Sequence, residues 1–255
     1  MTLLRAFRAE RLKLRRSYTA SAIVAGGLFV PAIMLAVRLH QNEKTAAMIR
    51  AGNYWMEHWK ESWESISILI LPLLTILVTT LIVQIEHRNN TWKQLHASPL
   101  SLPVIYLAKL AVLLVALAEI FVVISAGLFL AGWIPMRGGW NPFPAAELLL
   151  WNARFFLDML PVVGIQYLLA LTFRNFLAPM GAGVAGWILG LVVINSRYVI
   201  AVPYAYAGVD YLIRIGHRSG ASLPDVGMLS AATFLLSVAA GFSMYALARD
   251  RGMAQ

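Results

Sequence analysis

The titratable and nucleophilic residues of this chain do not occur at the spacings that common catalytic centres use. The 255 residues include no cysteine, so a thiol nucleophile, a disulfide framework and a cysteine metal site are excluded. None of the five histidines belongs to an H-E-x-x-H motif, and no G-x-S-x-G nucleophile elbow occurs. No glycine is followed by lysine, so a P-loop for ATP is absent. We therefore expect a protein that is not an enzyme, with no catalytic residue and no metal or cofactor bound by this chain.

One carboxylate falls inside an apolar stretch, where an ionisable side chain is costly. Glu119 lies near the middle of the run Leu110–Ile134. A carboxylate at the centre of a membrane helix costs roughly 2.5–3.5 kcal/mol on insertion scales, so it must face protein or water, or be protonated. Two interpretations stay open. Glu119 belongs to a substrate path or proton relay, or it is a hydrogen-bonded acid that holds helices together, with no evident intramembrane cation as partner.

Three tryptophans, Trp55, Trp59 and Trp63, recur every four residues among charged neighbours. On a helix their indoles share one face, which favours a helix that lies at the outer membrane interface. The alternative is an aromatic wall along the path of an amphipathic substrate.

Gly186 and Gly190 form a G-x-x-x-G pattern that Ala182 extends upstream. Small residues at this spacing let a second helix approach closely. The pattern predicts a helix-packing face, either within the chain or at a dimer interface.

These residues are carried by segments long enough to cross a bilayer. Hydrophobic residues make up 60% of the chain and charged residues only 13%, whereas soluble domains average about 50% and 25%. A helix of about 20 residues spans a hydrocarbon core of roughly 30 Å. The sequence therefore predicts an all-α membrane protein with six transmembrane helices in one domain, residues 1–255. The predicted spans are Tyr18–Val37, Ser65–Ile85, Leu110–Ile134, Phe155–Phe173, Phe176–Ile194 and Met228–Leu247.

Basic residues are concentrated at the start of the chain. Their placement fits an anionic membrane surface better than a nucleic acid, and we expect no nucleic-acid partner. An N-terminus in the cytoplasm puts the lysines and arginines near the span ends on that side, among few acids. Both termini are therefore predicted to be cytoplasmic. Six of the 21 basic residues lie in the first 16 positions: Arg5, Arg8, Arg11, Lys13, Arg15 and Arg16.

The polar segment between the second and third predicted spans carries signals for a short helix. Asn90 or Thr91 is suited to cap it, and Pro99 to end it. Trp92 and Leu95 then lie on one side. From the residues alone, a docking element and an ordinary loop both remain open. The segment reads Glu86-His-Arg-Asn-Asn-Thr-Trp-Lys-Gln-Leu-His-Ala-Ser-Pro99.

The pattern of an acid leaving the second span, then T-W-K-x-L, a proline, and Ala108-Lys109 opening the third span resembles ABC-2-type permeases. It is especially similar to the branch that includes lantibiotic- and bacitracin-resistance exporters. The six-span plan, the basic N-terminal helix and the length agree with this family over essentially the whole chain. The resemblance implies the fold of an ABC-2 (type V exporter-like) permease.

The resemblance also implies partners and site residues. Residues 86–103 correspond to a cytoplasmic coupling segment that contacts a separate ATPase subunit, expected in two copies, which binds the ATP and Mg. Residues 1–16 correspond to an interfacial helix, although Glu10 and Arg11 intrude on its apolar face. A second permease copy or paralogue completes the transporter in a bacterial plasma membrane, the inner membrane of a Gram-negative cell. The contact and anchoring candidates are Glu86, Asn90, Thr91, Trp92, Leu95, Pro99 and Lys109.

Because the predicted spans hold few charged groups, we expect export of a hydrophobic or amphipathic substrate: a peptide, an antibiotic or a lipid-like molecule. One alternative is an ion- or proton-coupled secondary transporter that uses Glu119. Another is a non-transporting assembly or sensor subunit of the membrane. A membrane enzyme is disfavoured by the missing catalytic motifs.

Overall fold

The computed structural model describes residues 3–14, 17–88, 101–136, 141–219 and 225–253, and these ranges contain helices and no strands. Helices are expected, because in lipid every backbone polar group must be satisfied within its own segment. The elements in chain order are α1 (Leu3–Leu14), α2 (Thr19–His40), α3 (Asn42–Ala51), α4 (Tyr54–Ser65), the π-helical turn η1 (Ile66–Ile70), α5 (Leu71–Arg88), α7 (Leu102–Trp133), η2 (Ile134–Met136), α8 (Ala145–Thr172), α9 (Leu177–Val193), η3 (Arg197–Ala201), η4 (Pro203–Ala205), α10 (Tyr206–Arg214) and α11 (Val226–Met253).

Helices long and apolar enough to cross a membrane account for most of the described chain. Five stretches meet this criterion, and they confirm an all-α, multi-pass membrane protein. The helix α9 is also apolar but has 17 residues, about 25 Å of length, which is short for a core of roughly 30 Å. The predicted sixth span therefore stays a prediction. The five stretches are Thr19–His40, Tyr54–Glu86, Leu102–Met136, Ala145–Thr172 and Val226–Leu247.

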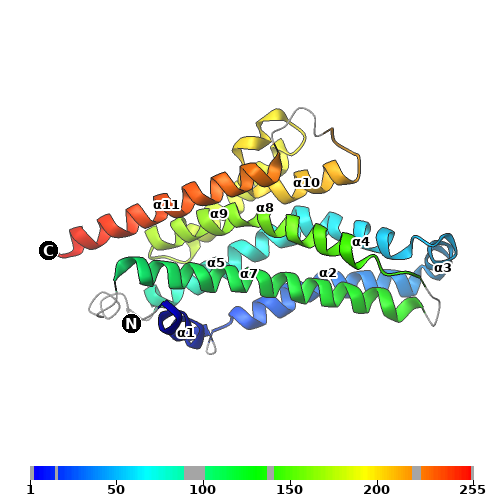
Figure 1. The fold of residues 1–255 in the computed structure, drawn as a ribbon, viewed down its shortest axis with the longest axis horizontal. Coiled ribbons are helices and arrows are strands. Elements are labelled where there is room, and N and C mark those ends of the chain that lie inside the picture. Colours follow the sequence, from blue (N-terminus) through cyan, green and yellow to red (C-terminus); the bar gives the residue numbers. More distant parts are fainter. Residues whose placement is uncertain (1–2, 15–16, 89–100, 137–140, 220–224, 254–255) are drawn as a thin grey trace.

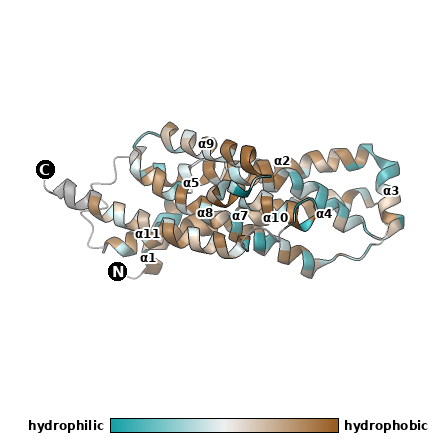
Figure 2. Ribbon diagram, turned by 90° about the horizontal axis from the view of Figure 1, so that it is seen from above, coloured by the Kyte–Doolittle hydropathy of each residue, from teal (hydrophilic) through white to brown (hydrophobic). Residues whose placement is uncertain are grey.

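The long helices lie side by side in an elongated bundle (Figure 1). The start of α1 and the end of α11 lie at the same end of this bundle, and α3 lies at the opposite end. Hydrophobic residues dominate along the bundle, whereas hydrophilic ones gather around α3 (Figure 2). We call the end that holds the arginine-rich α1 the basic end, and the end that holds α3 the distal end.

Close contacts between glycines and neighbouring side chains fix the register of α2 against α7. A Cβ atom on Gly27 would lie 2.8 Å from Val123, and one on Gly127 would lie 2.9 Å from Pro31. Residues 27 and 31 of α2 therefore lie level with residues 123 and 127 of α7, and the two helices run in the same direction. Such small-residue contacts are the usual means of close helix packing in membranes.

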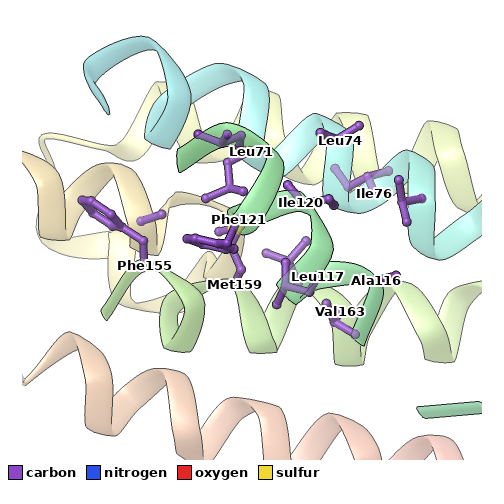
Figure 3. Close-up of a cluster of buried hydrophobic side chains, with 14 of the residues drawn as sticks. Leu71, Leu74, Ile76, Ala116, Leu117, Ile120, Phe121, Phe155, Met159 and Val163 are labelled. Carbon is purple, nitrogen blue, oxygen red and sulfur yellow. The ribbon is translucent and has the colours of Figure 1, made fainter. Parts of the chain in front are cut away.

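The centre of the bundle is a core contributed mainly by α5, α7 and α8. Ile76, Leu117 and Phe155 project into it and are at most 1% exposed (Figure 3). Because lipid is as apolar as these side chains, their packing contributes through van der Waals contact more than through exclusion of water. This core packs α5, α7 and α8 against one another.

Trp55, Trp59 and Trp63 are part of the protein interior, each at most 2% exposed. The Trp63 ring stacks on Phe155 with centroids 4.5 Å apart. Their helix α4 continues through η1 into α5 as one helical stretch of 33 residues, which contains the second apolar span. The predicted interfacial helix is therefore wrong, because lipid-facing indoles would be exposed. The charged residues between the tryptophans made this stretch resemble a surface segment.

At the distal end, one buried arginine joins three helices. Arg38 of α2 is 0% exposed, and its Nη2 lies 2.6 Å from a carboxylate oxygen of Glu61 in α4. Its Nε donates to Nδ1 of His58 at 3.2 Å. The other ring nitrogen of His58 lies 3.0 Å from the carbonyl oxygen of Leu128 in α7. These contacts satisfy the buried guanidinium, as a buried charge requires.

Two glycines of α9 pack against other residues of the same chain. A Cβ atom on Gly186 would lie 2.6 Å from the ring of Tyr204, and one on Gly190 would lie 3.2 Å from Ala205. Ala182 is exposed. The G-x-x-x-G face therefore packs on η4 of the same chain, so Gly186 and Gly190 are not open to a second copy.

Candidate functional site at the basic end of the bundle

Four charged side chains from three helices meet at the basic end. The Lys109 ammonium of α7 lies 2.6 Å from Oε2 of Glu10 in α1 and 2.8 Å from Oε2 of Glu86 in α5. Lys13 of α1 lies 2.9 Å from Oε1 of Glu86 and also donates a hydrogen bond to Glu10. We call Glu10, Lys13, Glu86 and Lys109 the ion network. Its charges alternate, so each carboxylate contacts two ammonium groups.

Three of the four side chains in the ion network are shielded from solvent, whereas that of Lys13 is 32% exposed. The side chains of Glu86 and Lys109 are 0% and 2% exposed, and that of Glu10 is 8% exposed. Charges buried to this degree are tolerated only when they are paired and hydrogen-bonded. Removing one member would leave an uncompensated charge, so the four residues act as one unit that holds α1 against α5 and α7.

The two network residues of α1 remain charged near neutral pH. Burial works to raise the pKa of Glu10, but the ammonium groups of Lys109 and Lys13 outweigh it and lower that pKa. Burial works to lower the pKa of Lys13, but the carboxylates of Glu86 and Glu10 outweigh it and raise that pKa. Each pKa therefore moves away from neutrality, which keeps the ion pairs formed at physiological pH.

The ion network flanks the predicted coupling segment on both sides. Glu86 lies in the last turn of α5, as the first residue of that segment, and Lys109 lies in the second turn of α7, after the segment ends. The remaining candidates of the segment fall outside the described residues. They are Asn90, Thr91, Trp92, Leu95 and Pro99.

A pair of tyrosines connects this end of α7 to two further helices. The rings of Tyr106 in α7 and Tyr167 in α8 stack with centroids 4.8 Å apart. The Tyr106 hydroxyl donates to the carbonyl oxygen of Val238 in α11 at 2.9 Å, and the Tyr167 hydroxyl donates to the carbonyl oxygen of Tyr106 at 3.2 Å. Neither tyrosine was predicted as a site residue from the sequence. Tyr106 lies three residues before Lys109, so one helix face carries both.

Glu119 forms an ion pair with a cation from another helix. An oxygen of its carboxylate lies 2.7 Å from Nη2 of Arg11 in α1, and the two side chains are about 40% exposed. Because Gly27 packs against Val123, Glu119 lies level with Ile23, in the second turn of α2. It therefore lies beside the start of α2, although it is midway along α7.

The residues that dock α1 are the ones that interrupt its apolar face. Glu10 and Arg11 looked like defects in an interfacial helix, whereas they contact Lys109 and Glu119. Leu3 and Leu4 are 46% and 56% exposed. The two charged residues on the otherwise apolar face of α1 were the sign in the sequence that this face contacts another helix.

Comparison with known proteins identifies a family. A family model described as ABC-2 family transporter protein matches residues 6–190. No curated protein and no solved structure matches the chain. The matched residues include the whole ion network, Glu119 and the first spans, and they extend over more than half of the chain.

Proposed function

The chain belongs to the ABC-2 transporter family and is a permease component of an ABC transporter, and we propose that a separate ATPase subunit drives it to export a hydrophobic or amphipathic substrate. The proposed complex contains two ATPase copies, which bind ATP and Mg, and a second permease copy or paralogue. It lies in a bacterial plasma membrane with both termini of this chain in the cytoplasm.

The observation that carries this proposal is the position of the ion network. The chain has no P-loop of its own, so the work of ATP hydrolysis must enter through a contact with another subunit. Glu86 and Lys109 stand on either side of residues 87–108 and contact each other at 2.8 Å. A displacement of the segment between them therefore acts on α5 and α7 together.

The same contacts give a route by which movement spreads through the bundle. Breaking a buried ion pair by loss of one partner costs about 3–5 kcal/mol. We therefore expect α1, α5 and α7 to move together, because separating them would break such pairs. From α7, the stacked rings of Tyr106 and Tyr167 and the hydrogen bond to Val238 reach α8 and α11. These are packed, contiguous contacts of the kind that carry coupling between distant sites.

The positions at which the helices begin and end support the proposal of six crossings. The α1 and α11 termini share the basic end (Figure 1), so a chain of spanning helices between them must cross an even number of times. The end of α8 lies beside α5, because Gln84 donates to the carbonyl oxygen of Phe173 at 2.9 Å. The start of α11 lies beside the distal half of α8, because Ser230 donates to Asp158 at 3.0 Å. We propose that α9 makes the return crossing.

A transport measurement tests the proposed function. The permease and its ATPase are reconstituted in vesicles that contain fluorescently labelled phosphatidylethanolamine or a labelled cationic peptide as probes. Trp92→Ala combined with Leu95→Ala should abolish ATP-dependent movement of a probe that the wild-type complex moves. Trp133→Ala is the matched control, since Trp133 is 61% exposed at the distal end of α7. Equal transport by both variants would overturn the assignment of residues 86–103 as the coupling segment.

A further inference from the structure

A cavity lies at the basic end between α1, the start of α2 and the middle of α7. Its volume is about 550 Å³, and its walls are mainly apolar. Three charged side chains, Arg8, Arg11 and Glu119, reach it from α1 and α7. Ala20 and Ile23 form its wall on α2.

The charges in this cavity favour an anionic ligand. Arg11 is paired with Glu119 at 2.7 Å, which leaves the Arg8 guanidinium with no ion-pair partner among the described residues. Two cations and one anion give the cavity a net positive charge. A phosphate group accepts hydrogen bonds from guanidinium groups with matching geometry.

An apolar track leads away from the cavity along α2. Ala20, Val24 and Leu28 are spaced four residues apart, so they share one helix face, and all three are exposed. Val24 and Leu28 lie further toward the distal end than the arginines. A ligand that uses both features has an anionic head at Arg8 and Arg11 and a hydrocarbon tail along this face of α2.

The depth of the cavity distinguishes a lipid from a free ion. Glu119 and Arg11 lie level with the second turn of a spanning helix, and their side chains are about 40% exposed. A partly exposed ion pair beside hydrocarbon is unfavourable unless polar groups solvate it. A lipid headgroup supplies those groups, and basic pockets beside membrane helices are suited to such headgroups.

We propose that this cavity is a binding site for an anionic phospholipid of the adjacent leaflet, with its phosphate at Arg8 and Arg11 and an acyl chain along Ala20, Val24 and Leu28. Glu119 competes with the phosphate for Arg11 and so limits the affinity. This site goes beyond the proposed transport function and does not depend on the ATPase.

Native mass spectrometry of the detergent-solubilised full chain tests the site. The protein is incubated with an equimolar mixture of dioleoylphosphatidylglycerol and dioleoylphosphatidylcholine, and the ratio of the two bound lipids is measured. The wild-type chain should retain more phosphatidylglycerol. Arg8→Gln should lower the ratio about fivefold, the effect of one arginine near an anionic headgroup. Arg5→Gln is the matched control, because Arg5 is an exposed arginine of the same helix that does not line the cavity.

Two further variants separate this site from general attraction to α1. Ala20→Phe keeps every charge but fills the apolar wall, so it should reduce bound phosphatidylglycerol. Glu119→Gln releases Arg11, so it should raise the ratio. Equal ratios for Arg8→Gln and Arg5→Gln, or no preference for phosphatidylglycerol in the wild-type chain, would overturn the proposal. Displacement of the lipid by 10 mM inorganic phosphate would assign the arginines to a free anion instead.

Discussion

At the residue scale, Lys109 is the buried cation of the ion network, and it contacts both carboxylates. It contacts Glu10 and Glu86 at 2.6 and 2.8 Å, and its side chain is 2% exposed. Without its ammonium, two buried carboxylates from different helices would face each other with only Lys13 nearby. The residue thus links the docking of α1 to the ends of α5 and α7.

We predict that Lys109→Met lowers the free energy of unfolding by about 3–5 kcal/mol, because it leaves uncompensated buried charge. The measurement is unfolding of the purified chain in detergent. Lys60→Met serves as the control, since Lys60 makes a partly exposed pair with Glu57 at 3.3 Å, and such pairs contribute about 0–1 kcal/mol.

The triple variant Glu10→Gln, Glu86→Gln and Lys109→Met should be more stable than Lys109→Met alone, because it removes the opposing carboxylates as well. This comparison separates charge from packing. A Lys109→Met chain as stable as the Lys60→Met chain would contradict the assignment of the network as a structural unit.

At the element scale, α9 is held by its glycines and by one tryptophan. The indole of Trp187 donates to the carbonyl oxygen of Ile68 at 2.8 Å. Ile68 belongs to η1, where the π-helical turn alters the normal helical bonding pattern. The residue before Trp187, Gly186, admits the ring of Tyr204. The short helix is therefore fixed against both η1 and η4.

We predict that Gly186→Ala lowers the free energy of unfolding by about 1–3 kcal/mol, as overpacking does, because its Cβ would lie 2.6 Å from Tyr204. Gly181→Ala is the control: a Cβ there meets nothing within 4 Å, and alanine favours a helix by about 1 kcal/mol. If Gly186→Ala instead dissociates a dimer of otherwise stable chains, then this glycine serves a subunit interface and the packing described above is wrong.

At the scale of the whole molecule, the crossing made by α9 decides the topology. Because the natural chain has no cysteine, single cysteines are specific labels. We predict that Arg197→Cys, beyond the distal end of α9, reacts in intact cells with a membrane-impermeant maleimide. Arg174→Cys, before α9, should react only after the membrane is opened. Both positions are exposed. Labelling of both from outside would mean that α9 does not cross.

Much of the architecture was predictable from the sequence, because a membrane span is a local feature. Runs such as Tyr18–Val37 and Met228–Leu247 closely match α2 and α11. The environment of the three tryptophans in α4 was misjudged. The hydropathy of this stretch is lowered by four charged residues, Glu57, Lys60, Glu61 and Glu64. Only tertiary contacts show that the neighbouring indoles face inward.

The candidate site was predictable in part. Glu86 and Lys109 emerged from the family resemblance, but their mutual contact did not. Ion pairs such as Arg11 with Glu119, or Glu10 with Lys109, join residues about a hundred positions apart. No periodicity or spacing within one segment encodes such a pair, so a single sequence does not reveal it.

The most direct test of the central claim is recovery of the ATPase partner. A tagged wild-type chain is purified from native membranes, and the proteins that accompany it are identified by mass spectrometry. We predict an ABC-type ATPase with a P-loop in the wild-type and Trp133→Ala preparations, and its loss with Trp92→Ala combined with Leu95→Ala. Repeated recovery of the intact wild-type chain without such an ATPase would contradict the proposal that a separate subunit drives this permease.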